Sequence, residues 1–124
     1  MDVTTITFSC TPEFVGIVRS LAELLFDPSG RGYEAKLITS ELVTNSVRHS
    51  RSRHGGHATA RFLIGDGFGR IEMIDDGADA APIPEDERDE RRRGLSAVVN
   101  GYADKWGHDA EAGQSVYWAE LYWG

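Results

Sequence analysis

The first part of the chain changes from an alternating pattern of apolar and polar residues to a helical one. From Thr4 to Cys10, apolar side chains alternate with hydroxyl residues, which is typical of a half-buried strand. The tripeptide Thr11-Pro12-Glu13 offers an N-cap hydroxyl, a proline for the first helical position and an acid for the first turn. Apolar residues then recur at helical spacing as far as Asp27-Pro28-Ser29-Gly30, so we expect a first helix between these segments.

The pattern that follows predicts a second helix and two strands. Apolar residues at helical spacing extend from about Tyr33 to His49. Two apolar runs, Ala58–Ile64 and Arg70–Ile74, have the length and composition of strands. The glycine-rich segment Gly65–Gly69 between them is expected to be a hairpin turn, because a dinucleotide-binding loop would be followed by a helix rather than by a strand.

The second part of the chain begins with a long segment that has no apolar periodicity. It extends from Asp75 to Arg93 and predicts a lid loop over about residues 76–93, since connections of this length in compact domains are usually functional or mobile. A short helix from Leu95 to about Gly101 and two closing strands, Ala103–Gly107 and Ser115–Trp123, are expected next. This order predicts one α+β domain over residues 1–124, a two-layer sandwich of a mixed, mostly antiparallel sheet with helices on one face.

Composition and net charge argue against some classes of function. The 124 residues suffice for one hydrophobic core, and the net charge of −7 argues against direct binding of nucleic acid or of an anionic membrane. Cys10 is the single cysteine, so a reduced setting is expected. The start of the chain lacks a signal-peptide pattern and no apolar run approaches the roughly 20 residues of a membrane span. We therefore expect a cytoplasmic protein.

Polar side chains recur on the second predicted helix. Glu41, Asn45 and His49 are four residues apart, and each step of four advances around a helix by only about 40°. The three therefore form one stripe, inside the arc that carries Ile38 and Leu42. Burying such groups without partners costs about 1–3 kcal/mol each, so we expect them to face a ligand or a polar cleft. On spacing alone, a solvated flank beside the core is an equal alternative.

Two further segments are candidates for ligand contact. Asp75-Asp76-Gly77 ends a predicted strand with a carboxylate, followed by a residue that permits close approach of a ligand to the backbone. Arg93-Gly94-Leu95 begins a predicted helix, where unpaired backbone N–H groups suit phosphate. Taken alone, each segment is more often a simple turn or helix start.

In their order and spacing these segments resemble the GHKL (Bergerat-fold) ATPase superfamily, and within it the small bacterial anti-sigma-factor serine kinases related to the histidine-kinase ATPase domain. Residues 40–49 resemble the N box, Glu-x-x-x-Asn-x-x-x-His. Asp75-Asp76-Gly77 resembles the first glycine box, and Arg93-Gly94-Leu95 the end of the second. Residues 103–107 and 114–121 are similar to the closing strands, so the resemblance covers nearly the whole chain.

The resemblance implies an ATP- and Mg²⁺-binding protein serine/threonine kinase. Glu41 would be the general base, Asn45 would bind Mg²⁺ and Asp75 would accept the amino proton of adenine. Contacts with the nucleotide would also come from the other matched positions, namely Arg48, His49, Gly77, Arg93, Gly94 and Ser115. The implied partners are a sigma factor and a small anti-anti-sigma antagonist that is phosphorylated on serine, with a homodimer as an option.

Two departures from the family pattern leave an alternative open. Asp79 and Arg92 stand where each glycine box would have a further glycine. A carboxylate repels phosphate, and a side chain restricts the backbone angles that wrap phosphate. The alternative function is therefore a non-catalytic protein-binding regulator that keeps the fold. A histidine-kinase fragment is a third hypothesis, disfavoured because no dimerisation helices precede the first predicted helix.

Arginines and tryptophans give two weaker expectations. A basic cluster is expected beside the N box near the proposed phosphate site, with solvated arginines as the alternative; its members are Arg48, Arg51, Arg53 and Arg61. Trp106, Trp118 and Trp123 are expected in the core or at a dimer face.

Overall fold

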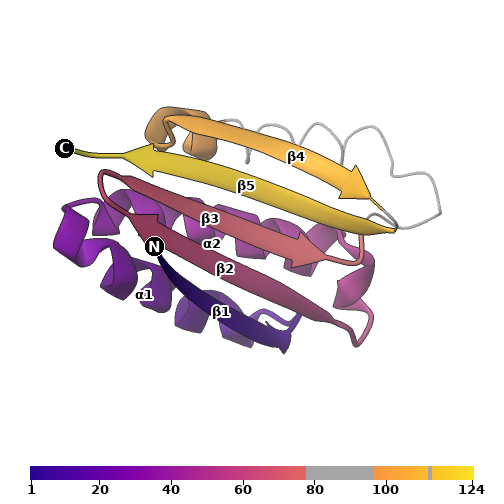
Figure 1. Ribbon diagram of the computed structural model, residues 1–124. Coiled ribbons are helices and arrows are strands. Elements are labelled where there is room, and N and C mark those ends of the chain that lie inside the picture. The colour runs from indigo at the N-terminus through magenta and orange to yellow at the C-terminus, as the bar shows by residue number, and fades with distance from the viewer. Residues whose placement is uncertain (78–96, 112) are drawn as a thin grey trace.

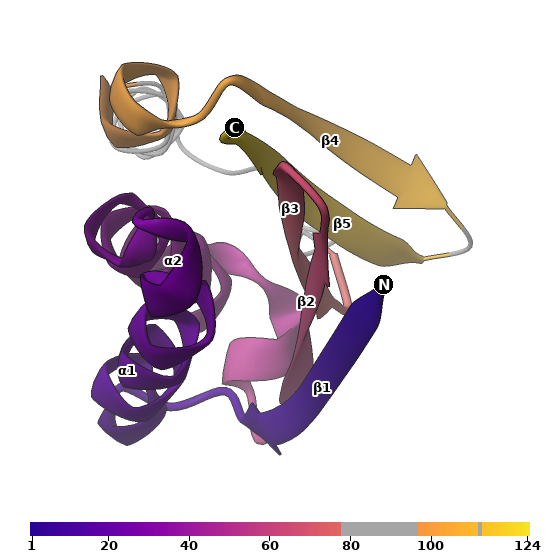
Figure 2. The ribbon, with the colours of Figure 1, turned by 60° about the vertical axis from the view of Figure 1, so that its left-hand side comes forward.

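The computed structural model describes residues 1–77, 97–111 and 113–124, which form a sheet and a layer of helices (Figures 1 and 2). The elements in chain order are β1 (Asp2–Ser9), α1 (Glu13–Phe26), η1 (Asp27–Ser29), α2 (Gly32–His49), η2 (Arg51–Arg53), β2 (His57–Gly65), β3 (Phe68–Asp75), β4 (Lys105–Glu111) and β5 (Gln114–Tyr122), where η marks a 3₁₀ turn. Residues 97–102 are also helical. The α+β sandwich expected from the sequence is confirmed.

The five strands form one sheet in the order β1-β2-β3-β5-β4, and each pairing is antiparallel. Figure 2 shows α1 and α2 on the same side of this sheet. Side chains that face the helices are in register across the strands: Ile71 of β3 lies opposite Phe62 of β2 and Ala119 of β5. All three are buried, so the core lies between the sheet and the helices.

Close packing of the core explains one glycine of β3. The ring of Phe26, at the end of α1, meets the ring of Trp123 edge to face, with 6.1 Å between centroids. A Cβ atom on Gly69 would lie 2.4 Å from Cε1 of Phe26 and 2.9 Å from Cη2 of Trp123. The position therefore admits no side chain unless these rings move. The largest fully buried side chains of the core include Phe62, Ile38, Leu42, Ile71, Met73 and Leu121.

Several boundaries differ from the sequence prediction, and the structure explains two of them. The fourth strand begins at Lys105 rather than at Ala103, because the Ala103 N–H donates to the Val99 carbonyl at 2.8 Å and thus continues the preceding helix. The first helix begins at Glu13, and Thr11 does not cap it. The Thr11 hydroxyl donates instead to the Glu13 carboxylate at 2.5 Å.

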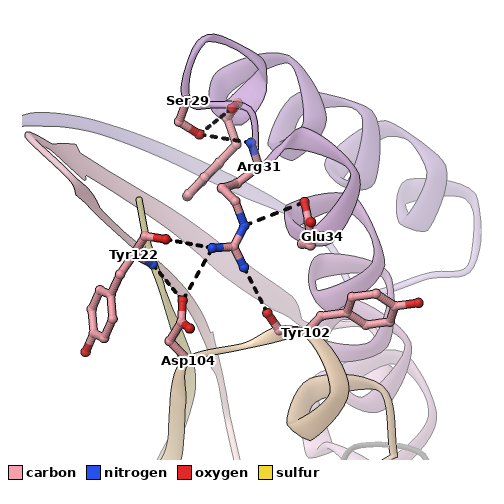
Figure 3. Close-up of polar contacts among 7 residues, drawn as sticks. Ser29, Arg31, Glu34, Tyr102, Asp104 and Tyr122 are labelled. Atoms are coloured by element: carbon pink, nitrogen blue, oxygen red, sulfur yellow. Dashed lines mark hydrogen bonds and ion pairs between the residues drawn. The ribbon is translucent and has the colours of Figure 1, made fainter. Parts of the chain in front are cut away.

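Arg31 connects the start of α2 with the end of the chain, as Figure 3 shows. Its Nη1 donates to the Tyr122 carbonyl at 2.6 Å and lies 3.5 Å from an Asp104 carboxylate oxygen, and its Nη2 donates to the Tyr102 carbonyl at 3.3 Å. The same Asp104 oxygen accepts the Tyr122 N–H at 2.7 Å. One side chain thus holds the residues after the 97–102 helix against the end of β5.

The expected lid loop is described only at its start. Asp76 and Gly77 belong to the described residues, whereas residues 78–93 lie outside them. Among the helices of the described ranges, none is long and apolar enough to cross a membrane.

Candidate functional site

Asp75 is held in a fixed orientation at the end of β3. It faces the helices and is only 3% exposed. The Ser46 hydroxyl of α2 donates to Asp75 Oδ2 at 2.5 Å, and the Gly77 N–H donates to Oδ1 at 2.8 Å. A carboxylate oxygen has two lone-pair directions, so each oxygen can accept a further hydrogen bond. The buried carboxylate is thereby held in one orientation by two internal donors.

Gly77 adopts a backbone conformation that suits a glycine. Its φ is +82°, in the left-handed region that other residues rarely adopt. A Cβ atom there would lie 3.1 Å from the Gly113 carbonyl oxygen. The turn after β3 therefore depends on this glycine.

Asn45 carries a buried amide on α2. The residue is 5% exposed, and within the described part of the chain neither Oδ1 nor Nδ2 has a hydrogen-bond partner. Such a buried group costs about 1–3 kcal/mol unless a ligand satisfies it. The amide oxygen is a hard ligand of the kind that Mg²⁺ prefers. Asn45 therefore fits the metal-binding role that the sequence resemblance implies.

Glu41 lies one helical turn before Asn45 on α2 and is partly buried. Burial raises the pKa of its carboxyl group above the usual value, and the charge of Arg48 offsets only part of this. A carboxylate with a raised pKa is a stronger proton acceptor, which suits a general base. In the last turn of α2, Arg48 is exposed and His49 is half-buried.

Ser115 lies directly opposite Asp75 in the register of β3 and β5. It is 3% exposed, and its Oγ lies 2.6 Å from Nε2 of His108 on β4. The resemblance implies that Ser115 contacts the nucleotide, and the strand register places it beside Asp75. His108 was not foreseen, because only the pairing of β4 with β5 places it there.

Three serines near Asp75 were also missed. The first is Ser46. The second is Ser52, whose hydroxyl donates to Asp76 Oδ2 at 2.9 Å and accepts the Asp76 N–H at 2.9 Å. The Ser50 hydroxyl donates to the Ser46 carbonyl at 2.7 Å. Serine is common in every structural context, so the sequence offers no sign of these bonds. The position of Ser46, adjacent to Asn45 on the buried arc of α2, is the one indication that could have been used.

The expected basic cluster does not form as predicted. Arg61 alternates with buried Ala60 and Phe62, so it lies on the sheet face away from the helices, where it pairs with Glu72 at 3.4 Å. Arg51 instead forms hydrogen bonds with backbone carbonyls near Asp75. Its guanidinium donates to the carbonyls of Asp76, at 2.7 and 2.9 Å, and of Gly113, at 3.0 Å.

The structure thus brings together two groups of expected residues. Asp75, Gly77 and Ser115 meet at one end of the sheet, while Glu41 and Asn45 lie on α2. The bond from Ser46 to Asp75 joins the two groups. Arg93 and Gly94 lie outside the described residues, as do Asp79 and Arg92, so their roles remain predictions.

The architecture, with its sheet covered on one side by helices, is that of the histidine-kinase-like ATPase fold. The RsbU and RsbW domains of Rv1364c from Mycobacterium tuberculosis match 99% of this chain with a TM-score of 0.71 and 18% identity. The Acinetobacter baumannii histidine kinase AdeS matches 100% of it with a TM-score of 0.56 and 13% identity. The chain spans 33% of the mycobacterial two-domain chain and 70% of the histidine-kinase chain in those structures. No protein-family model and no curated protein sequence matches the chain.

Proposed function

We propose that this chain is an ATP- and Mg²⁺-dependent regulatory serine/threonine kinase of the anti-sigma type. The observation that carries the proposal is the buried amide of Asn45, which has no hydrogen-bond partner among the described residues and lies one turn after Glu41, next to the residue that holds Asp75. A buried amide of this kind needs a ligand from outside the described residues. The likeness in fold to an RsbW domain and to a histidine kinase agrees with this class of protein.

In the proposed complex, Asp75 accepts a hydrogen bond from the amino group of adenine. Its two oxygens already accept the Ser46 hydroxyl and the Gly77 N–H, so the carboxylate is oriented before the nucleotide arrives. The Asn45 amide oxygen would hold Mg²⁺, which when bound neutralises part of the phosphate charge.

Glu41 carries the proton in the proposed reaction. The serine oxygen of the protein substrate forms a bond to the γ-phosphorus, the bond from that phosphorus to the bridging oxygen breaks, and ADP leaves. The serine proton passes to the Glu41 carboxylate, whose pKa is raised by burial. Glu41 is partly exposed, so a protein substrate can approach it.

The proposed partners are a sigma factor and a small anti-anti-sigma antagonist, which is the phosphorylated protein. They follow from the resemblance of the sequence to anti-sigma-factor kinases. The likeness in fold to a chain with an RsbW domain supports a regulatory role of this kind. A cytoplasmic location and the option of a homodimer belong to the same proposal.

The proposal is tested by incubating the chain with ATP, Mg²⁺ and a candidate antagonist and detecting phosphoserine by mass spectrometry. The wild-type protein should phosphorylate one serine. Glu41→Gln should slow transfer by about 10²- to 10⁴-fold, the contribution of a general base, with little change in ATP affinity. Glu23→Gln, which alters a surface ion pair with Lys36, is the matched control and should retain full activity.

The alternative, a non-catalytic regulator that binds its partners through the same fold, is favoured by Asp79 and Arg92 at expected glycine positions. ATP binding without transfer to any candidate antagonist would support it. In that case Glu41→Ala would leave binding of the partners and regulation intact.

A further inference from the structure

His108, on β4, contacts Ser115 at the proposed nucleobase end of the site. It lies opposite Tyr117 in the pairing of β4 with β5, and its ring stacks on the Tyr117 ring with 4.1 Å between centroids and 12° between planes. Its Nε2 lies 2.6 Å from Ser115 Oγ. The stacking fixes the plane of the imidazole, and the short hydrogen bond fixes which nitrogen meets the serine.

This contact decides what the Ser115 hydroxyl can offer to a ligand. A serine hydroxyl has one proton to donate. If Nε2 accepts that proton, Ser115 presents only lone pairs to the nucleobase. If Nε2 carries a hydrogen and donates it to Oγ, the serine proton is available to the nucleobase. The protonated nitrogen of His108 therefore sets Ser115 as donor or acceptor.

The distinction matters because Asp75, opposite Ser115, can only accept when ionised. The Watson–Crick edge of adenine carries an amino donor beside the N1 acceptor. A 6-oxopurine carries a carbonyl acceptor beside an N1–H donor, which is the reverse. Among purines, an acceptor at Asp75 combined with a donor at Ser115 matches adenine and not a 6-oxopurine.

We infer that His108 is a positioning residue that donates from Nε2 to Ser115 and so turns the Ser115 proton toward the nucleobase. The site thereby discriminates adenine from 6-oxopurine nucleotides. The inference rests on the proposed binding of ATP and adds to it a residue that determines base specificity.

The test is calorimetric titration of ATP and of inosine 5′-triphosphate, each with Mg²⁺, into the wild-type protein and four variants. His108→Phe keeps a ring that can stack on Tyr117 but removes both nitrogens. Ser115→Ala removes the hydroxyl, a third variant combines the two changes, and His108→Gln restores an amide N–H near the position of Nε2.

We expect His108→Phe and Ser115→Ala each to lower ATP affinity by about threefold to tenfold, the value of one hydrogen bond, and to lower the preference for ATP over inosine triphosphate. Because His108 acts through Ser115, the double variant should lose no more than Ser115→Ala alone. His108→Gln should recover most of the preference, whereas a purely structural loss of packing would not be recovered.

Two results would overturn the inference. Losses that add in the double variant would show that His108 does not act through Ser115, and an unchanged base preference in His108→Phe would show that it does not set specificity. Neither result contradicts the proposed function, provided that the wild-type protein binds ATP. Failure of the wild-type protein to bind ATP contradicts the proposed function and the inference together.

Discussion

At the residue scale, the general-base role proposed for Glu41 would come at a cost in stability. Burial raises the pKa of its carboxyl group, with only partial compensation from Arg48. The folded chain therefore holds this proton more tightly than the unfolded chain does. As a result, the free energy of unfolding falls as the pH rises through the ordinary glutamate pKa toward the raised one, and the loss is complete above both. A carboxylate that costs stability at neutral pH is a mark of a functional group.

Glu41→Gln should accordingly raise the melting temperature at pH 7.5 and change it little at pH values below the ordinary glutamate pKa of about 4.3. The reason is that glutamine resembles the protonated carboxyl group, which the folded protein already favours at low pH. Thermal denaturation followed by circular dichroism at several pH values measures the effect. A melting temperature that falls at pH 7.5, or rises equally at every pH, would contradict the assignment of a raised pKa.

The residues of the site differ in how well the sequence predicts them. Asn45 and Asp75 could be predicted, because helical spacing places the first among buried apolar residues and a strand end exposes the second to a turn. Ser46 and His108 could not, because their partners are 29 and seven residues away and are set by how a helix meets a strand and how two strands pair. The position of Arg61 was wrong because the face of a strand depends on its register.

At the scale of elements, contact of β3 with α1 depends on Gly69. Gly69→Ala would bring a Cβ within 2.4 Å of Phe26 and 2.9 Å of Trp123, so these rings must shift. We expect a loss of about 1–3 kcal/mol in the free energy of unfolding, typical of an overpacked core. Urea denaturation measures it.

Gly101→Ala is the matched control for this change. Gly101 belongs to the helical residues 97–102, and no atom lies within 4 Å of a Cβ built on it. Alanine should there be neutral or stabilising by up to about 1 kcal/mol, because glycine is a poor helix former. Equal effects of the two substitutions would contradict the packing described for Gly69.

Arg31 joins three elements, and its removal should loosen one end of the molecule (Figure 3). Arg31→Ala leaves the Tyr122 carbonyl and the Asp104 carboxylate without their charged donor. We expect a loss of about 1–3 kcal/mol, with faster hydrogen exchange at the amides of Ala103 and Tyr122. Lys36→Ala, which removes a surface ion pair with Glu23, should cost under about 1 kcal/mol. Unchanged exchange at both amides would contradict this role of Arg31.

Elements were predicted best where apolar periodicity is strong. The second helix and the two central strands, β2 and β3, lie within about two residues of their expected bounds. The fourth strand was predicted too early in the chain and too short. Its residues Gly107, His108 and Asp109 carry little apolar periodicity, so its pairing with β5 rather than its own pattern determines where it extends.

At the scale of the whole molecule, the arginines are distributed differently from the sequence expectation. Arg61 and Arg70 lie on the sheet face away from the helices, where they alternate with Glu72 and Glu120 in a chain of ion pairs. The Arg70 guanidinium also lies 4.4 Å from the Trp118 ring centroid. Burial alone would lower the pKa of Arg70, but hydrogen bonds with Glu120 and Glu72 outweigh it and the pKa is raised. These arginines pair with carboxylates on the sheet instead of lining the proposed nucleotide site.

The central claim, that the chain binds ATP through Mg²⁺ at Asn45 and through adenine at Asp75, is tested most directly by calorimetric titration of ATP with and without Mg²⁺. The wild-type protein should bind ATP more tightly with Mg²⁺ present. Asn45→Ala should lose that dependence on Mg²⁺, and Asp75→Asn should bind at least about tenfold more weakly under both conditions. No heat of binding with the wild-type protein, or equal affinities for all three proteins, would contradict the claim.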